Sequence, residues 1–145
     1  MSGRATTTVR EARPGDREAM LRLLADLGYA SDAGTLEERL GRIEDEPSVQ
    51  VLVAERDGEV IALASLHVLH LIERSPLGRL SAIVVGEPVR RSGVGRALIE
   101  RVEHEARDAG CDRLEVTSGE WREDAHAFYG DLGFEETSKR FIKRL

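Results

Sequence analysis

The chain has 145 residues, of which 41% are hydrophobic and 33% charged, and this suits one globular domain with a buried core. Its net charge of −6 argues against a non-specific nucleic-acid binder, because such a protein needs a basic surface. No apolar stretch reaches the roughly 20 residues of a membrane-spanning helix, and the first residues lack the apolar core of a signal peptide. The single cysteine, Cys111, excludes an internal disulfide. We therefore expect one domain over residues 1–145, in the cytoplasm and without a membrane or nucleic-acid partner.

The first third of the chain predicts a strand followed by two helices. Residues 6–10 suit a strand, and Asp16 is placed to cap a helix that Gly28 ends. Thr35 and Glu38 have the spacing of a capping box, which predicts the start of a second helix. The loop between the two helices either borders a substrate site or simply connects them.

A hairpin is predicted next. Valines alternate with other residues over positions 49–53, Asp57-Gly58 is a strong turn signal, and residues 59–71 suit a longer strand. Because this second strand is apolar on both faces, we expect it in the middle of the sheet.

The stretch from Leu80 to Gly110 predicts a strand, a loop and a long helix. Leu80–Val85 is apolar and rich in β-branched residues, so it suits a buried strand. An apolar stripe with helical spacing begins at Val94, and Gly110 is a good stop for that helix.

The loop before this helix has the features of a phosphate site. The first N–H groups of a helix lack internal partners and attract anions, and Gly93 and Gly95 allow the backbone to approach closely. Arg90, Arg91 and Arg96 add positive charge beside the same spot. An ordinary helix start with a tight glycine turn is the alternative interpretation.

The end of the chain predicts a strand over 113–117, a helix closed by Gly133, and short strands over 134–137 and 140–145. The resulting order is βααβββαβαββ, which describes an α/β domain with a mixed, mostly antiparallel sheet flanked by helices. Exposed strand edges near the C-terminus leave room for a homodimer.

Two motifs in this order resemble the GCN5-related N-acetyltransferase (GNAT) superfamily. They are Arg90-x-x-Gly93-x-Gly95 and, after the long helix and one strand, Ala125-x-x-Phe128-Tyr129-x-x-x-Gly133-Phe134. A Rossmann fingerprint would need a third glycine where Leu98 stands, and a Walker loop would need a Gly-Lys-Ser/Thr sequence that the chain lacks.

The resemblance implies acetyl-CoA as the co-substrate. The glycine turn would cradle its pyrophosphate, and the two central strands, 80–85 and 113–117, would splay apart to admit the pantetheine arm and the thioester. The cofactor-binding residues that the resemblance implies are Ile83, Val84, Val85, Arg90, Arg91, Ser92, Gly93, Val94, Gly95, Arg96 and Tyr129.

Tyr129 matches the family tyrosine that serves as general acid. A phenol within hydrogen-bond reach of the sulfur can give a proton to the CoA thiolate as it leaves. A backbone N–H, which we expect to be that of Val85, would polarise the thioester carbonyl. Simple packing of Tyr129 beside Phe128 is the alternative.

The general base stays open. An alkylamine has a pKa near 10, as lysine does, so some group must accept its proton. Several relatives have a glutamate on the central strand, which this chain lacks. The candidates are Glu115, placed first as a catalytic residue, and then His67, His70 and Glu120. Since His67 and His70 lie three apart on a strand and point to opposite faces, no metal site is expected.

The implied activity is direct transfer of an acetyl group to a small-molecule primary amine in a ternary complex. The closing segment loosely resembles the aminoalkylphosphonate N-acetyltransferase branch of the superfamily. Arg122 stands where the family often has an asparagine that helps hold the cofactor arm, so that contact is either replaced or lost. Acetylation of a protein N-terminus or lysine, and acetyl-CoA sensing without catalysis, are the alternatives.

Overall fold

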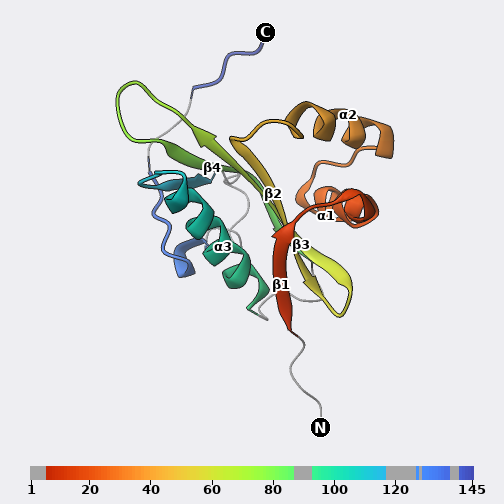
Figure 1. The fold of residues 1–145 in the computed structure, drawn as a ribbon. Coiled ribbons are helices and arrows are strands. Elements are labelled where there is room, and N and C mark those ends of the chain that lie inside the picture. Colours follow the sequence, from red (N-terminus) through yellow and green to blue (C-terminus); the bar gives the residue numbers. More distant parts are fainter. Residues whose placement is uncertain (1–5, 87–92, 117–126, 128, 138–140) are drawn as a thin grey trace.

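A computed structural model describes residues 6–86, 93–116, 127, 129–137 and 141–145 (Figure 1). Its elements, in chain order, are β1 Thr7–Glu11, a short 3₁₀ turn Pro14–Asp16, α1 Arg17–Leu27, α2 Ala33–Ile43, β2 Val49–Arg56, β3 Glu59–Leu69, β4 Leu77–Val85, α3 Val94–Asp108 and β5 Leu114–Val116. Among these described helices, none is both long and apolar enough to cross a membrane.

The five described strands form one sheet in the order β1-β2-β3-β4-β5. Neighbouring strands are antiparallel except for β4 and β5, which are parallel. The sheet is therefore mixed and mostly antiparallel, as predicted, and the strand that is apolar on both faces, β3, lies at its centre. Figure 1 shows α3 on one face of the sheet and α1 with α2 on the other.

Each face of the sheet has its own apolar core, because the strands alternate their side chains between the two helical layers. The core on the α3 face includes Leu52, Leu66, Leu80, Leu98 and Val102. The core on the α1 and α2 face includes Met20, Leu23, Val53, Leu63 and Val84. With both faces covered, the sheet forms a rigid platform for the residues at its edges.

The predicted turn between β2 and β3 is confirmed. Asp57 and Gly58 both have positive φ, 53° and 77°, which is the conformation of the two-residue turn that matches the twist of a hairpin. Glycine adopts this conformation without strain, and aspartate is among the few other residues that tolerate it.

The two predicted helix starts differ from the structure. The helix α2 begins earlier than the Thr35 box implied, because Asp32 is its N-cap and accepts the Thr35 N–H at 2.7 Å. Asp16 does stand at the N-cap of α1, but its side chain makes no capping bond. Its carboxylate instead accepts the Arg13 N–H at 2.8 Å and both terminal nitrogens of the Arg10 guanidinium.

The strands predicted at the C-terminus are wrong for the residues described there. Residues 134–137 and 141–145 have no strand conformation. The Phe134 N–H bonds to the Tyr129 carbonyl at 3.0 Å, so it is not offered to a strand ladder. Phe141 is 98% exposed, and the segment of residues 141–145 leads away from the sheet (Figure 1).

Candidate functional site

The number of described strands that pair with β4 changes along its length. On the β5 side, the described parallel register runs only over Gly78–Leu80, opposite Leu114–Val116. On the β3 side, β4 stays paired as far as Val85. The second half of β4 therefore has a described strand neighbour on one side only, at the place where the resemblance puts the thioester.

A β-bulge marks the point at which this change occurs. Ser65 of β3 is opposite Ala82 and Leu66 is opposite Leu80, so Ser81 is the extra residue on β4. The bulge shifts the alternation of β4 by one residue, so that Leu80 and Ile83 both enter the core on the α3 face. Ser81 stays exposed.

The cofactor-binding residues predicted on β4 follow this bulge in the chain. Ile83 and Val84 are buried in opposite cores, 6% exposed each, and Val85 is half-buried against the α3-side core. The side chains of the first two face away from solvent. Ile83 and Val84 thus expose little surface in the described part of the chain.

The N-terminus of α3 follows the end of β4 in the chain. Gly93 is its N-cap with φ 88°, and a Cβ built there meets no described atom within 4 Å. Val94 and Gly95 are buried in the first turn, while Arg96 is exposed and its guanidinium donates to the Asp131 carbonyl at 3.4 Å. The first-turn N–H groups of this helix have no partner within the helix.

Tyr129 is positioned by a helix stop. Gly133 has φ 92°, its N–H bonds to the Gly130 carbonyl at 3.0 Å, and the Phe134 N–H bonds to the Tyr129 carbonyl at the same distance. These are the two bonds of a Schellman motif, which requires a left-handed residue at the glycine position. The Tyr129 and Phe134 rings meet edge to face, 5.8 Å apart, and both pack on the α3-side core. The Tyr-x-x-x-Gly-Phe spacing thus has a direct physical cause.

Polar side chains gather on the α1 and α2 face, next to the bulge. His67 Nε2 lies 2.9 Å from Ser81 Oγ and 3.3 Å from Ser65 Oγ. Burial, and to a smaller extent the charge of Arg79, lowers the pKa of His67 below its usual 6.5. The imidazole is therefore neutral at pH 7 and can accept a proton.

Glu115, the first candidate for the base, lies at the outer side of the same face. Its carboxylate is 3.1 Å from the Arg79 guanidinium and 3.8 Å from that of Arg113. His70 is exposed beyond the end of β3.

Several predicted residues lie outside the described part of the chain. They are Arg90, Arg91, Ser92, Glu120, Arg122 and Phe128. Conversely, the sequence did not single out Ser65 or Arg79 as site residues. Polar residues at 65 and 67, two apart on an otherwise apolar strand, were the available signal for Ser65.

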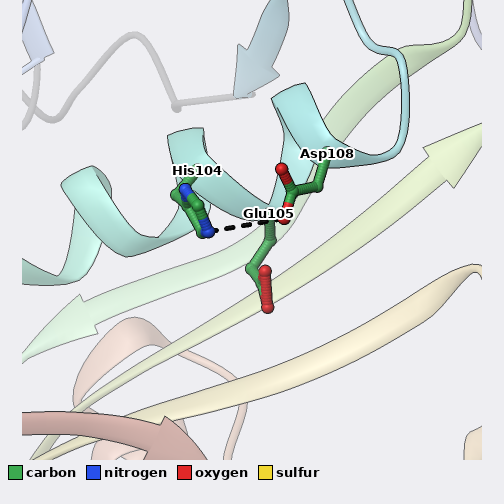
Figure 2. A group of neighbouring side chains, drawn as sticks. All are labelled: His104, Glu105 and Asp108. Atoms are coloured by element: carbon green, nitrogen blue, oxygen red, sulfur yellow. Dashed lines mark ion pairs between the residues drawn. The ribbon is translucent and has the colours of Figure 1, made fainter.

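A second cluster of titratable groups lies on α3, away from the residues discussed so far. Figure 2 shows His104, Glu105 and Asp108, whose ligand atoms all lie within 4.8 Å of one another. His104 pairs with Asp108 at 3.3 Å, and Glu105 pairs with Arg101 at 3.6 Å. Ordinary i, i+4 pairing on a solvated helix face accounts for this group.

Comparisons with known proteins identify the family of the chain. A model of the acetyltransferase (GNAT) family matches residues 17–134. Aminoglycoside N(6′)-acetyltransferase type 1 of Stenotrophomonas maltophilia is 36% identical over 137 residues, which are 91% of this chain and 88% of that enzyme. Aminoalkylphosphonate N-acetyltransferase of Salmonella typhimurium is 37% identical over 101 residues, which are 69% of this chain and 66% of that enzyme.

The fold has close counterparts among solved structures. An aminoglycoside N-acetyltransferase in complex with CoA superimposes with a TM-score of 0.88 and covers all of this chain and 98% of that one. Its sequence identity is 20%, so this likeness concerns the fold alone.

Proposed function

The chain belongs to the acetyltransferase (GNAT) family, whose acetyl donor is acetyl-CoA, and we propose from this premise that it acetylates the primary amine of a small molecule. The observation that carries the proposal is the path of β4. This strand runs past its described pairing with β5, and the chain then reaches the glycine-led N-terminus of α3. The same stretch of chain thus contains the strand whose backbone would line the thioester arm and the helix start that would hold its phosphates.

The helix start fits an anionic group. The N–H groups of Val94, Gly95 and Arg96 lie in the first turn, at the positive end of the α3 dipole. Gly93 has open space in front of it. These residues would hold the pyrophosphate of acetyl-CoA, together with Arg90, Arg91 and Ser92, which remain predictions from the sequence.

Tyr129 is proposed as the general acid. Acetyl-CoA supplies an activated thioester, and the leaving thiolate needs a proton. The Schellman stop and the Phe134 contact hold the Tyr129 ring at one edge of the α3-side core. The Tyr129 hydroxyl would give its proton to the thiolate, while the Val85 N–H would stabilise the carbonyl oxygen. The backbone of Ile83 and Val84 would line the arm.

The substrate proposal rests on the relatives. Two of them are named for small molecules that carry amines, an aminoglycoside and an aminoalkylphosphonate. We propose a primary amine of this size as the acceptor, without committing to either chemical class. A cytoplasmic location and a homodimer remain predictions from the sequence.

The binding half of the proposal is tested with two glycines of α3. Gly93 and Gly110 stand at opposite ends of the helix, with φ of 88° and 87° and no described atom within 4 Å of a Cβ. Alanine at either position carries the same backbone strain, about 1–2 kcal/mol. We expect Gly93→Ala to weaken acetyl-CoA binding about tenfold in calorimetry, because its first-turn N–H groups shift. Gly110→Ala should bind as the parent does, and equal weakening by both variants would contradict the placement.

The chemical half is tested with Tyr129→Phe, which removes one hydroxyl and keeps the ring. We expect turnover of a responsive amine, measured as CoA release, to fall by about 100-fold, since a positioned general acid contributes at least this factor. The affinity for acetyl-CoA should change less than about threefold. Undiminished turnover would remove the acid role from Tyr129.

A further inference from the structure

Three polar side chains, Ser65, His67 and Ser81, form a cluster on the α1 and α2 face of the sheet. His67 Nε2 is 2.9 Å from Ser81 Oγ and 3.3 Å from Ser65 Oγ. A histidine within hydrogen-bond reach of a hydroxyl is the arrangement that moves protons in many enzymes. These three side chains are therefore candidates for moving a proton.

The pairing of β3 with β4 explains why the cluster exists. His67 is opposite Arg79 and Ser65 is opposite Ala82, on the two sides of the bulge. Ser81 is the extra residue between these two pairs, and it follows Arg79 by two residues, so strand alternation places its side chain on the same face as Arg79 and His67. The Ser81 hydroxyl of β4 thus lies on the same face as the Ser65 and His67 side chains of β3.

The position of Ser81 along β4 gives the cluster its significance. The described pairing of β4 with β5 ends at Leu80, one residue earlier. Ser81 is exposed, whereas Ile83 and Val84, two and three residues further on, are buried. Ser81 is thus the more exposed partner of the contact with His67, which is half-buried.

The groups around His67 favour a neutral imidazole. Val49 lies opposite it on β2, Arg79 opposite it on β4, and Glu115 beyond Arg79 on β5. The Glu115 carboxylate is engaged by Arg79 at 3.1 Å, which leaves burial and the arginine charge to act on the ring. A neutral ring with its proton on Nδ1 has a free electron pair on Nε2 that points to Ser81 Oγ.

We propose that His67 and Ser81 together accept the proton of the substrate amine, with Ser65 holding the ring in place. This inference rests on the proposed acetyl transfer and names the base for it. An ammonium group gives one proton to Ser81 Oγ as the Ser81 hydroxyl proton passes to His67 Nε2, and the imidazolium then releases it to solvent. The nitrogen forms its bond to the acetyl carbon while the carbon–sulfur bond breaks. The nitrogen loses its second proton as the amide forms, and this proton passes through solvent to the Tyr129 phenolate, which has given its own proton to the thiolate.

Glu115 is less suited to this step. Its carboxylate is already engaged by two guanidinium groups, at 3.1 Å from Arg79 and 3.8 Å from Arg113, so a substrate amine would have to compete with both of them. Glu115 is also about half exposed, so water competes for any amine that approaches it. A carboxylate in this position suits attraction of a cationic substrate better than removal of its proton.

The test compares pH–rate profiles for CoA release by the parent protein and the variants His67→Gln, Ser81→Ala, Glu115→Gln and His104→Gln. Glutamine can keep a hydrogen bond to Ser81 but cannot take a proton. We expect His67→Gln to lose about 100-fold in turnover at pH 7 and to recover steeply at high pH, where the amine is already neutral. Ser81→Ala should lose about tenfold. The control His104→Gln, on the solvated face of α3, should match the parent protein.

The outcomes separate this inference from the function on which it rests. If His67→Gln and Ser81→Ala keep the parent turnover and pH profile, the inference fails, and a large loss in Glu115→Gln would move the base there. If the parent protein binds acetyl-CoA but releases no CoA with any amine tested, the proposed function itself fails. Thermal unfolding of each variant shows whether a loss of turnover comes from misfolding. Because Ser81 is exposed, Ser81→Ala should keep the stability of the parent protein, and its turnover tests the inference even if His67→Gln misfolds.

Discussion

Two polar clusters on the same face of the sheet differ in how completely their groups are paired. At the end of β2 near the hairpin turn, Arg10 bridges Asp16 and Glu55, with N–O distances of 2.8 Å to each. At the other end of β2, the cluster of Ser65, His67 and Ser81 contains no ion pair. The first cluster is a network of paired charges in which the buried Arg10 Nε atom has no hydrogen-bond partner, and the second is a neutral group open to solvent.

The difference separates a structural role from a chemical one. Both carboxylate oxygens of Asp16 have donors, from Arg10 and from the Arg13 N–H, and Asp16 is only 5% exposed. Such a network stabilises the fold, because removing one partner leaves a buried charge without compensation. Ser81, in contrast, is exposed and accepts or donates to incoming groups at little cost to the fold.

The largest effect on stability should come from Asp16→Asn. Loss of the carboxylate leaves the Arg10 guanidinium without its buried partner, and we expect the free energy of unfolding to fall by about 3 kcal/mol in urea denaturation. The exposed pair of Arg42 and Glu38 gives a matched control, since Glu38→Gln should cost less than about 0.5 kcal/mol. Similar losses of unfolding free energy in both variants would contradict the expectation that the buried Arg10 cluster stabilises the fold more than the exposed pair.

The Arg10 and Asp16 cluster should also make the stability of the fold depend on pH. Hydrogen bonds from Arg10 hold the pKa of Asp16 below its usual 3.8. A carboxyl whose pKa is lower in the folded state stabilises the fold above about pH 4. That contribution is lost as the pH falls through the folded pKa. The stability difference between the parent protein and Asp16→Asn should therefore shrink on acidification below pH 4.

The smallest effect should come from Arg79→Met, which tests the role of His67 in the second cluster. Arg79 is the minor cause of the low pKa of His67, after burial. Its removal should raise the pKa of His67, so the acid limb of the pH–rate profile should move to higher pH by a fraction of a unit. Stability should change little, because the Arg79 and Glu115 side chains are almost half exposed. An acid limb that stays in place would indicate that His67 does not set it.

The sequence alone determined most of the secondary structure of this protein. The alternation of the valines, the Asp57-Gly58 turn and the apolar stripe of α3 are local signals, and each predicted its element. Glycines 28 and 133 follow the same rule, since a left-handed residue after a helix has a local cost that glycine avoids. The family motifs around Gly93 and Tyr129 could also be recognised from the sequence, because each is a short pattern of residues close together in the chain.

Only the tertiary structure decided which polar residues meet. The Arg10 network joins residues 45 positions apart, and the contact of His67 with Ser81 joins β3 to β4 beside the one-residue register shift that makes Ser81 the extra residue of β4. A register shift is set by packing on both faces of a sheet, so no periodicity within one strand reveals it. The C-terminal strands failed for a related reason. An apolar pattern such as that of Phe141 and Ile142 becomes a strand only where a neighbouring strand is available to pair with it.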